Sequence, residues 1–171
     1  MTSTEQSFRA ELVGLLPRLR RFGRALTRSR EDADDLVQIA VERALGRRIQ
    51  WEPGTRLDSW MFRIMRNAWI DEIRARSRRA EVPANDDEGG PPQAAVPDTH
   101  LEALAIRSAM QRLGEDQRLA VSLVLVEGMP YKEAAEVLEI PIGTLTSRLA
   151  RARERLQELL AEDGRPPEPG R

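Results

Sequence analysis

The stretch EVPANDDEGGPPQAAVPD, residues 81–98, limits the possible folds of this chain more than any other feature. It holds four prolines, two glycines and five acidic residues, and it contains neither an aromatic nor a basic side chain. A segment of this composition buries too little apolar surface to offset the conformational entropy lost on folding, so it behaves as a linker. It therefore divides the 171 residues into two small modules of about 75 and 62 residues.

Both modules are predicted to be helical, because apolar residues recur at helical spacing and no segment alternates as a strand does. Hydrophobic residues make up 40% of the chain and aromatic residues only 4%, which suits small helical bundles better than a β-sandwich. We predict an all-α fold of two small domains, residues 1–80 and 99–160, with a flexible linker at 81–98 and a disordered tail at 161–171. The expected helices cover residues 8–26, 30–46, 57–79, 99–112, 116–127, 131–138 and 142–160.

Two local signals refine this prediction. Pro17 lies in the middle of the opening helical pattern, where a proline kinks or divides a helix. The sequence TRLD resembles a capping box, with Thr55 as the N-cap and Asp58 in place of the usual glutamate.

Composition excludes several kinds of site. The chain has no cysteine, so disulfides, thiolate metal sites and cysteine nucleophiles are excluded. His100 is its single histidine, which argues against a multi-histidine metal site or a conventional catalytic triad. No apolar run approaches 18 residues and no signal peptide is recognisable. We therefore expect a soluble, cytoplasmic protein without a metal or another cofactor.

Charge is unevenly distributed although the net charge is only −1. Residues 1–80 carry 17 basic and 11 acidic side chains, a balance of +6, whereas residues 99–160 carry 8 basic and 9 acidic ones. The positive first module indicates a polyanionic partner.

The sequence YKEAAEVLEIPIGTLTSRLARARERL has the spacing of a helix-turn-helix. Ala134 and Ala135 allow close helix crossing, and Glu139 stands in the turn where many such motifs have glycine. On a helical wheel the second helix has an apolar stripe of Ile142, Leu145, Leu149, Ala152, Leu156 and Leu159. Its opposite face carries Thr144, Ser147, Arg148, Arg151 and Arg155. Short hydroxyl groups followed by arginines suit a helix that reads the major groove.

Two faces of the first module lack a role in its predicted core. The 30–46 helix presents an isoleucine among polar groups, as expected of a protein-docking surface: Asp35, Gln38, Ile39 and Glu42. The 57–79 helix presents an amide and charged groups that suit unstacked bases and phosphates: Arg63, Asn67, Asp71 and Arg74. Trp51, in the preceding turn, is a candidate stacking platform, whereas Trp60 and Trp69 are expected in the core.

Three motifs occur in order around the linker: DADDLVQ, PGTRLDSWMFRIMRNAWIDEIR and LGEDQRLAVSLVLVEGMPYKEAAEVLEIPIGTLTSRLARAR. Together they resemble the small bacterial sigma factors of the extracytoplasmic-function group, and the resemblance covers residues 8–160. It implies a region 2-like domain and a region 4-like domain that lend promoter recognition to core RNA polymerase, with no catalysis and no small-molecule substrate. It also implies contacts with the polymerase β′ clamp and β flap, and an anti-sigma factor as a regulator.

The resemblance also implies roles for the two modules. Asp35, Gln38, Ile39 and Glu42 would dock on the clamp. Trp51, Asn67 and Asp71 would capture a flipped base of the melted −10 element, and the RARSRR segment would hold phosphates through Arg74, Arg76, Arg78 and Arg79. The 142–155 helix would enter the −35 major groove. Fully extended, the 18-residue linker reaches at most about 60 Å, or some 17–18 base pairs, so two tethered modules can read two separated elements.

Two other interpretations remain open at this point. A repressor or activator could use the C-terminal helix-turn-helix, but it would need a dimer interface for which the second module shows no spare apolar face. A helical nuclease could use Asp32, Asp34 and Asp35 as metal ligands, although Asp32 and Asp34 fall in a predicted capping turn.

Overall fold

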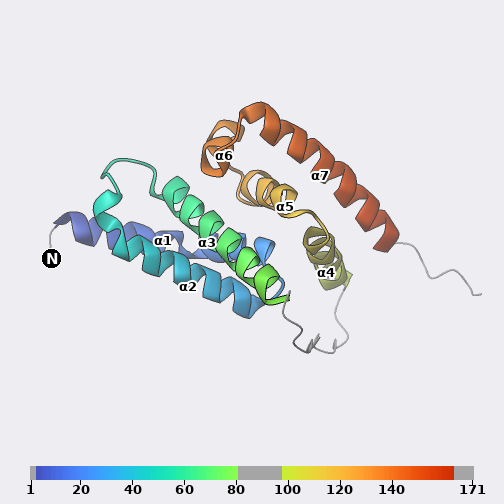
Figure 1. Ribbon diagram of the computed structural model, residues 1–171, viewed down its shortest axis with the longest axis horizontal. Coiled ribbons are helices and arrows are strands. Elements are labelled where there is room, and N and C mark those ends of the chain that lie inside the picture. The colour runs from blue at the N-terminus through green and yellow to red at the C-terminus, as the bar shows by residue number, and fades with distance from the viewer. Residues whose placement is uncertain (1–2, 81–97, 164–171) are drawn as a thin grey trace, which may run out of the picture.

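The computed structural model describes residues 3–80 and 98–163, and every regular element in these ranges is helical (Figure 1). In chain order the elements are α1 (Ser3–Leu26), α2 (Arg30–Gly46), the 3-10 helix η1 (Arg48–Gln50), α3 (Leu57–Ala80), α4 (Asp98–Gln111), α5 (Glu115–Val121), the π-helical η2 (Ser122–Val126), α6 (Tyr131–Leu138) and α7 (Ile142–Asp163). The predicted all-α fold is confirmed. Residues 81–97 of the predicted linker and residues 164–171 of the predicted tail lie outside the described residues.

Helices α1, α2 and α3 form an N-terminal module around large apolar side chains that have no exposed surface. The rings of Phe22 and Phe62 meet edge to face, with their centroids 5.0 Å apart. Gly23 lets α1 approach α2 closely, because a Cβ atom there would lie 3.2 Å from the carbonyl oxygen of Ala33. α2 begins at a serine cap, where the Ser29 Oγ accepts the Asp32 N–H at 3.0 Å.

Helix α1 is continuous through Pro17, so of the two predicted effects of this proline, a kink or a division, the division does not occur. Pro17 lies on the exposed face of the helix. Leu12 and Leu19, on either side of the proline, are both buried in the core. The packing of these flanking turns holds the helix together despite the backbone hydrogen bond that proline removes.

The predicted capping box does not form at the start of α3. The helix begins at Leu57, and the Thr55 hydroxyl instead donates to the carbonyl of Glu52 at 2.7 Å, closing the preceding turn. Gly54 in this turn has a φ of +88°, which only glycine adopts readily. The Asp58 carboxylate accepts its neighbour's N–H, from Ser59, and pairs with arginines rather than with the N-cap.

Helices α4 to α7 form a C-terminal module in which α7 packs along α5 and α4. The apolar stripe predicted for α7 is buried at Leu145, Leu149 and Leu159. Ile142 departs from the prediction, because it is 52% exposed at the first position of α7, on the rim of a shallow hollow beside Ile140 and Pro141.

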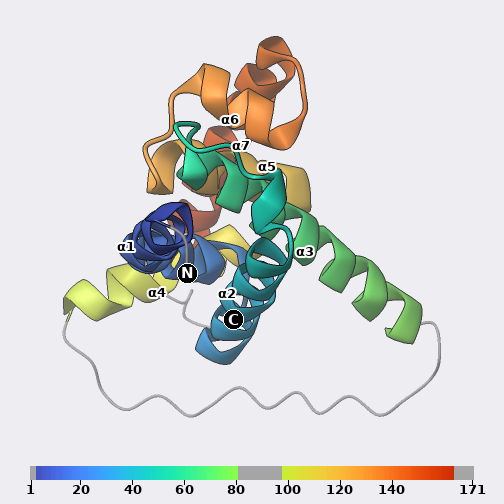
Figure 2. The same ribbon diagram turned by 90° about the vertical axis from the view of Figure 1, so that its left-hand side faces the viewer.

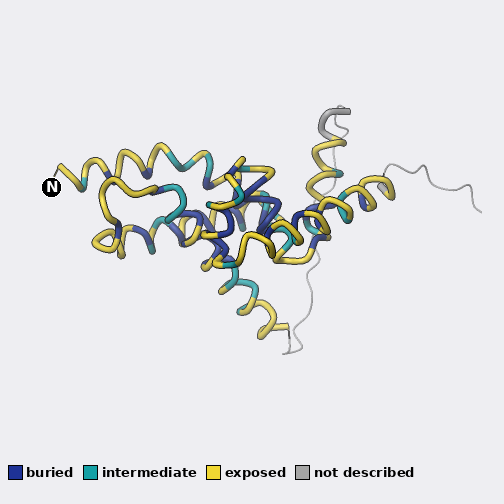
Figure 3. Tube along the Cα trace, turned by 90° about the horizontal axis from the view of Figure 1, so that it is seen from above, coloured by how far each residue is buried: buried dark blue, intermediate teal, exposed yellow. Residues whose placement is uncertain are grey.

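The two modules pack against each other. α1 contacts η2, α4 and α5, and α3 contacts α6, so that helices far apart in the sequence lie side by side (Figures 1 and 2). Buried residues gather where the helices meet in the middle of the molecule, and those of both modules belong to one contiguous apolar cluster (Figure 3).

Candidate functional site

The predicted docking face of α2 is polar apart from Ile39. The inward face of the helix is buried through Leu36 and Ala40, while the predicted docking face is exposed. That exposed face consists of Asp35, Gln38, Ile39 and Glu42. The Gln38 amide donates to the Glu42 carboxylate at 3.1 Å, one helical turn away. A partner can therefore contact all four side chains on one surface of a rigid helix.

Asn67, on α3, is exposed, but its amide oxygen is occupied. It accepts two hydrogen bonds from the guanidinium of Arg66, at 3.0 Å and 2.7 Å. The same guanidinium donates to the carbonyl of Val137 at 2.6 Å and pairs with Glu139 at 2.8 Å. The pairing lowers the pKa of Glu139, chiefly through the hydrogen bond from Arg66. Sequence reasoning missed Arg66, which is only 8% exposed, because an arginine is expected on the outside of a helix.

The other charged residues predicted for the α3 face are exposed, and two of them tie α3 to α2. Asp71 pairs with Arg43 at 3.0 Å, and Arg76 pairs with Asp32 at 3.0 Å. Arg63 is exposed and donates to the carbonyl of Glu136 on α6 at 3.4 Å. The exposed arginines at the end of α3 are Arg74, Arg76, Arg78 and Arg79. The helix therefore ends in a basic surface suited to phosphates.

Trp51 does not offer the exposed stacking surface that we predicted. It is 7% exposed, and its ring packs against Phe8 with the centroids 5.3 Å apart. Its indole N–H finds no hydrogen-bond partner among the described residues. The ring is needed to close the end of the N-terminal module, which explains its burial. Of the other tryptophans, Trp69 is buried as expected and Trp60 is partly buried.

The helix-turn-helix turn forms as the spacing predicts. Ala134 and Ala135 are buried where α6 crosses its neighbours. Glu139 adopts a left-handed conformation with a φ of +57°, which explains why glycine is common at this position in such motifs. Its N–H caps α6 by donating to Glu136.

The outward face of α7 carries the five predicted groups. Three of them are exposed, and two are partly exposed and form ion pairs. Thr144, Ser147 and Arg151 are exposed, and the Ser147 hydroxyl donates to the carbonyl of Gly143 at 3.0 Å. Arg148 and Arg155 are partly exposed and form ion pairs, with Asp116 at 3.1 Å and with Glu158 at 2.9 Å. The helix therefore presents hydroxyl and guanidinium groups outward near its N-terminal end, which is the end that reaches base edges in a groove-reading helix.

A groove of about 420 Å³ runs between α2, α3 and α5. Asp35 and Ile39 from the predicted docking face, Arg76 from the end of α3 and Arg118 from α5 line it. Burial lowers the pKa of Arg118, and nearby Arg28 acts in the same direction. The guanidinium of Arg118 lies over the Trp69 ring, 5.8 Å from its centroid. The predicted docking face thus continues into a groove bounded by the second module.

Residues 3–80 and 98–163 hold no group of three or more histidine, cysteine or acidic side chains placed to bind a metal ion. Asp32, one of the acids considered as a metal ligand, is instead paired with Arg76. In the same ranges no helix is both long and apolar enough to cross a membrane.

Two family models match the chain. Residues 12–66 match the sigma2 domain of PhyR, and residues 103–156 match region 4 of sigma-70. Among curated proteins, the ECF RNA polymerase sigma factor EcfG of Rhodopseudomonas palustris is 37% identical over 162 residues, which cover 92% of this chain and 87% of EcfG. SigM of Mycobacterium tuberculosis, also an ECF RNA polymerase sigma factor, is 34% identical, over 83% of this chain and 71% of SigM.

Solved structures of sigma factors are similar to this chain as well. The sigma factor RpoE of Bartonella quintana, crystallised with the anti-sigma factor NepR, superimposes with a TM-score of 0.75 at 34% sequence identity. The match covers 91% of this chain and 98% of RpoE. CnrH, solved with the cytosolic domain of CnrY, shares the fold with a TM-score of 0.71 at 24% identity.

Proposed function

The chain belongs to the extracytoplasmic-function (ECF) family of RNA polymerase sigma factors, and on this premise we propose how its surfaces divide the work of promoter recognition. It is an alternative sigma factor that directs promoter-specific initiation of transcription by core RNA polymerase. In this proposal residues 1–80 dock on polymerase and read the −10 element, residues 99–160 read the −35 element, and residues 81–98 connect the two. Nucleotide addition stays with the core enzyme, so this chain supplies recognition and no catalysis.

The face of α2 docks on the β′ clamp. This assignment is supported by the exposure of all four side chains, including Ile39, which is 36% exposed although it is apolar. Charged and amide groups around one isoleucine can give orientation through hydrogen bonds and affinity through desolvation of the apolar side chain. The C-terminal module contacts the β flap.

The face of α3 binds the melted −10 strand. Asn67 holds a flipped base through its amide, with Asp71 and Arg63 beside it, and the arginines at the end of α3 bind backbone phosphates. Trp51 lies inside the module in the arrangement described here. It takes part only if the turn around it rearranges when DNA binds.

Helix α7 reads the −35 duplex. Thr144 and Ser147 lie nearest the N-terminal end, Arg148 and Arg151 follow on the same face, and Arg155 is one turn further along. Arginine forks suit guanine in the major groove, and a later arginine suits a phosphate. The single observation that carries the proposal is this outward polar face on the second helix of a helix-turn-helix, in a chain that also exposes the α2 face.

An anti-sigma factor is the expected regulator, since the structure of similar RpoE was solved with one. The chain acts where polymerase and promoter DNA are, in the cytoplasm, and the proposal requires neither a metal nor another cofactor. Reconstituted transcription tests it: the chain, core polymerase and the upstream region of its own gene should give a defined transcript. Core polymerase alone serves as the control. An absence of any chain-dependent start site on that template and on a randomised promoter library would refute the proposal.

A further inference from the structure

Asp71 places a carboxylate on the face of α3 that is proposed to bind DNA. Its side chain is 56% exposed, and among the described residues it forms an ion pair with Arg43 of α2, at 3.0 Å. Helix α2 packs along α3 at this point (Figure 1). A carboxylate repels the phosphates of a DNA strand, so Asp71 opposes binding unless it accepts a hydrogen bond from a base.

Arg43 fixes the orientation of this carboxylate. Its guanidinium donates from Nη1 to the Oδ2 atom of Asp71 at 3.0 Å. The Arg43 side chain is only 35% exposed, so the packing of α2 on α3 limits its movement. The other carboxylate oxygen, Oδ1, accepts no hydrogen bond from the described residues. Asp71 therefore presents an acceptor that is held in place and still available.

Asn67, one helical turn before Asp71, presents a donor. Its amide oxygen accepts two hydrogen bonds from the Arg66 guanidinium, at 3.0 Å and 2.7 Å. A guanidinium has no acceptor, so these bonds determine which end of the amide is the oxygen. The NH2 group points the other way and donates to none of the described residues. Asn67 is thus also held by an arginine, with its donor free.

Arg74 supplies a second donor on the same face. It follows Asp71 by three residues and Asn67 by seven, and residues at these spacings share one side of a helix. Arg74 is exposed and forms no ion pair with the described residues. Its guanidinium has several N–H donors and no acceptor, so it can contact a base and a phosphate together. Along α3 the face therefore presents a donor, an acceptor and a donor.

This order of groups complements the Watson–Crick edge of thymine. Thymine presents a carbonyl, an imino N–H and a second carbonyl. Guanine presents a carbonyl followed by two donors, so one of its donors would face a donor. Cytosine presents an amino group followed by two acceptors, and adenine an amino group followed by one acceptor, so both mismatch at two positions. Among the four bases, thymine alone matches all three groups.

We propose that this face captures a flipped thymine of the −10 element and that Arg43 positions Asp71 to recognise it. The thymine N3–H donates to Asp71, and the two carbonyl oxygens accept from Asn67 and Arg74. Because arginines already hold the amide and the carboxylate, little side-chain order has to be gained when the base enters. The proposal rests on the proposed function, since it presumes that this face takes a base from the melted strand.

The main test exchanges two side chains, as Asn67→Asp combined with Asp71→Asn. The exchange preserves net charge and nearly preserves shape. Arg66 and Arg43 still take an oxygen at each position, so the free group becomes a carboxylate oxygen at position 67 and an amide NH2 at position 71. Together with Arg74 the face then presents an acceptor, a donor and a donor, which complements cytosine. We expect the base preference to change from thymine to cytosine.

Binding is measured with core polymerase carrying the full-length chain. The probe is a promoter from the gene's own upstream region, with the non-template strand of its −10 element left single-stranded. Each position of this element carries thymine, cytosine, adenine or guanine in turn. The unmodified chain should favour thymine over cytosine at one position by about ten- to hundredfold, because cytosine leaves the charged acceptor unpaired. The exchanged variant should reverse this ratio at the same position.

Base analogues test the hydrogen bond to Asp71 without changing the protein. Deoxyuridine has the same Watson–Crick edge as thymine and should bind equally well. N3-methylthymine, whose imino N–H is blocked, should lose the about ten- to hundredfold advantage of thymine. Equal binding of thymine and N3-methylthymine would overturn the proposal.

Two single substitutions separate base recognition from general charge. Asp71→Asn should abolish the preference for thymine, because the acceptor becomes a donor. Glu72→Gln is the matched control: Glu72 is the next residue of α3, is also paired with an arginine, at 3.0 Å, and loses the same charge. Glu72→Gln should keep the thymine preference. An equal loss of preference in both variants would reduce the role of Asp71 to charge and would overturn the proposal.

Arg43 acts through Asp71, so its replacement should change base discrimination while circular dichroism shows unchanged helix content. Arg43→Gln should lower the ratio of thymine to cytosine binding, and Arg43→Lys, which keeps a cation beside the carboxylate, should retain most of it. An unchanged ratio in Arg43→Gln would make Arg43 a purely structural residue and refute its positioning role.

A thymine preference that survives the exchange of positions 67 and 71 would overturn the base assignment. So would a lack of base preference at every −10 position in the unmodified holoenzyme. Reconstituted transcription keeps this result apart from the proposed function. A chain-dependent transcript without a thymine preference refutes only the base assignment, whereas the absence of any chain-dependent transcript refutes the proposed function.

Discussion

Replacing Asp116 by asparagine should strengthen binding to the −35 element, because Arg148 must leave Asp116 before it can contact a base. The ion pair is 3.1 Å long, and the Asp116 side chain is 67% exposed. An exposed pair of this kind contributes about 0–1 kcal/mol, whereas a bidentate arginine–guanine contact is worth about 1–3 kcal/mol. Breaking the pair therefore costs part of what the base contact gains. Asp116→Asn should recover up to about 1 kcal/mol, or about fivefold in affinity.

The three arginines on the outward face of α7 should contribute unequally to binding. Arg151 forms no ion pair with the described residues, so Arg151→Ala should lose the full 1–3 kcal/mol or so and relax preference at one base position. Arg148→Ala should lose less binding free energy than Arg151→Ala. The difference should equal the contribution of the ion pair between Arg148 and Asp116. Arg155→Ala should weaken all sequences evenly and lower the salt dependence by about one phosphate contact.

The assay is binding of reconstituted holoenzyme to a promoter library randomised in the −35 element, at two salt concentrations. Glu154→Gln is the control for Asp116→Asn, because Glu154 is an exposed acid on α7 without an ion pair among the described residues. An equal gain from both changes would mean that Asp116 acts only through general charge. Uniform losses for all three arginine variants would refute sequence reading by these side chains.

Three further predictions concern the N-terminal module. Asn67→Ala should impair promoter opening more than duplex binding, since the amide is proposed to hold a base that only melting exposes; permanganate reactivity of the −10 region measures this, and a signal at the unmodified level would make Asn67 structural. Asp35→Ala with Gln38→Ala should weaken binding to core polymerase while circular dichroism stays unchanged, and equal affinity in a titration would remove that face from the docking site. Burial opposes ionisation of Asp58, but hydrogen bonds from two arginines and a backbone N–H outweigh it and hold its pKa at about 2, below the ordinary 3.8. Its contribution to the free energy of unfolding is therefore present above about pH 4 and lost as the pH falls through 2, so in urea titrations Asp58→Asn should flatten this pH dependence, and an unchanged slope would contradict the assignment.

Sequence periodicity was sufficient to predict the helices and to predict which faces of α2 and α7 are exposed. Both depend on local rules: the apolar stripe decides which side of a helix is buried, and what remains is exposed. Ser29 at the start of α2 and the turn at Glu139 follow from equally local chemistry.

Contacts between residues far apart in the chain could not be predicted from the sequence. Nothing near Arg66 shows that its guanidinium lies under the turn of a helix more than 70 residues away. Glu127 pairs with an arginine 106 residues earlier, and it directly follows a π-helical turn. The exposure of Trp51 was mispredicted for a similar reason, since its burial depends on the Phe8 ring of α1, which is far away in the sequence.

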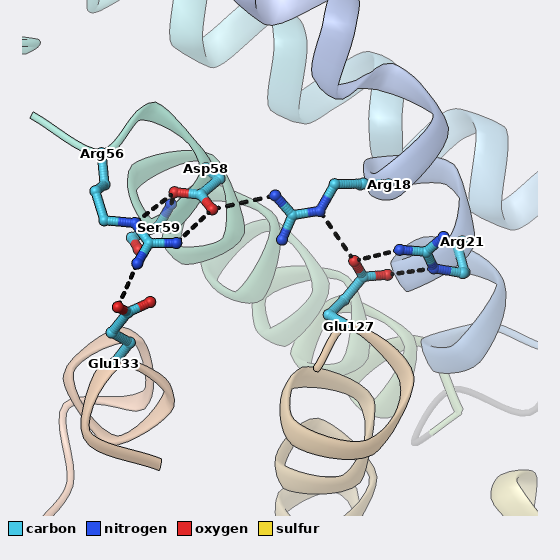
Figure 4. Close-up of polar contacts among 7 residues, drawn as sticks. All are labelled: Arg18, Arg21, Arg56, Asp58, Ser59, Glu127 and Glu133. Atoms are coloured by element: carbon cyan, nitrogen blue, oxygen red, sulfur yellow. Dashed lines mark hydrogen bonds and ion pairs between the residues drawn. The ribbon is translucent and has the colours of Figure 1, made fainter. Parts of the chain in front are cut away.

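Ion pairs join the two modules where Arg18 and Arg21 of α1 meet Glu127 and where Arg56 meets Glu133 (Figure 4). A buried carboxylate such as that of Glu127 loses much of its Coulombic gain to desolvation, so these ion pairs specify how the modules meet more than they add to stability. All three arginine side chains of these pairs are partly exposed, with Arg18 at 34%, Arg21 at 53% and Arg56 at 55%, which weakens each pair further. Buried residues of both modules form one contiguous apolar cluster. Apolar burial therefore holds the modules together more than these ion pairs do.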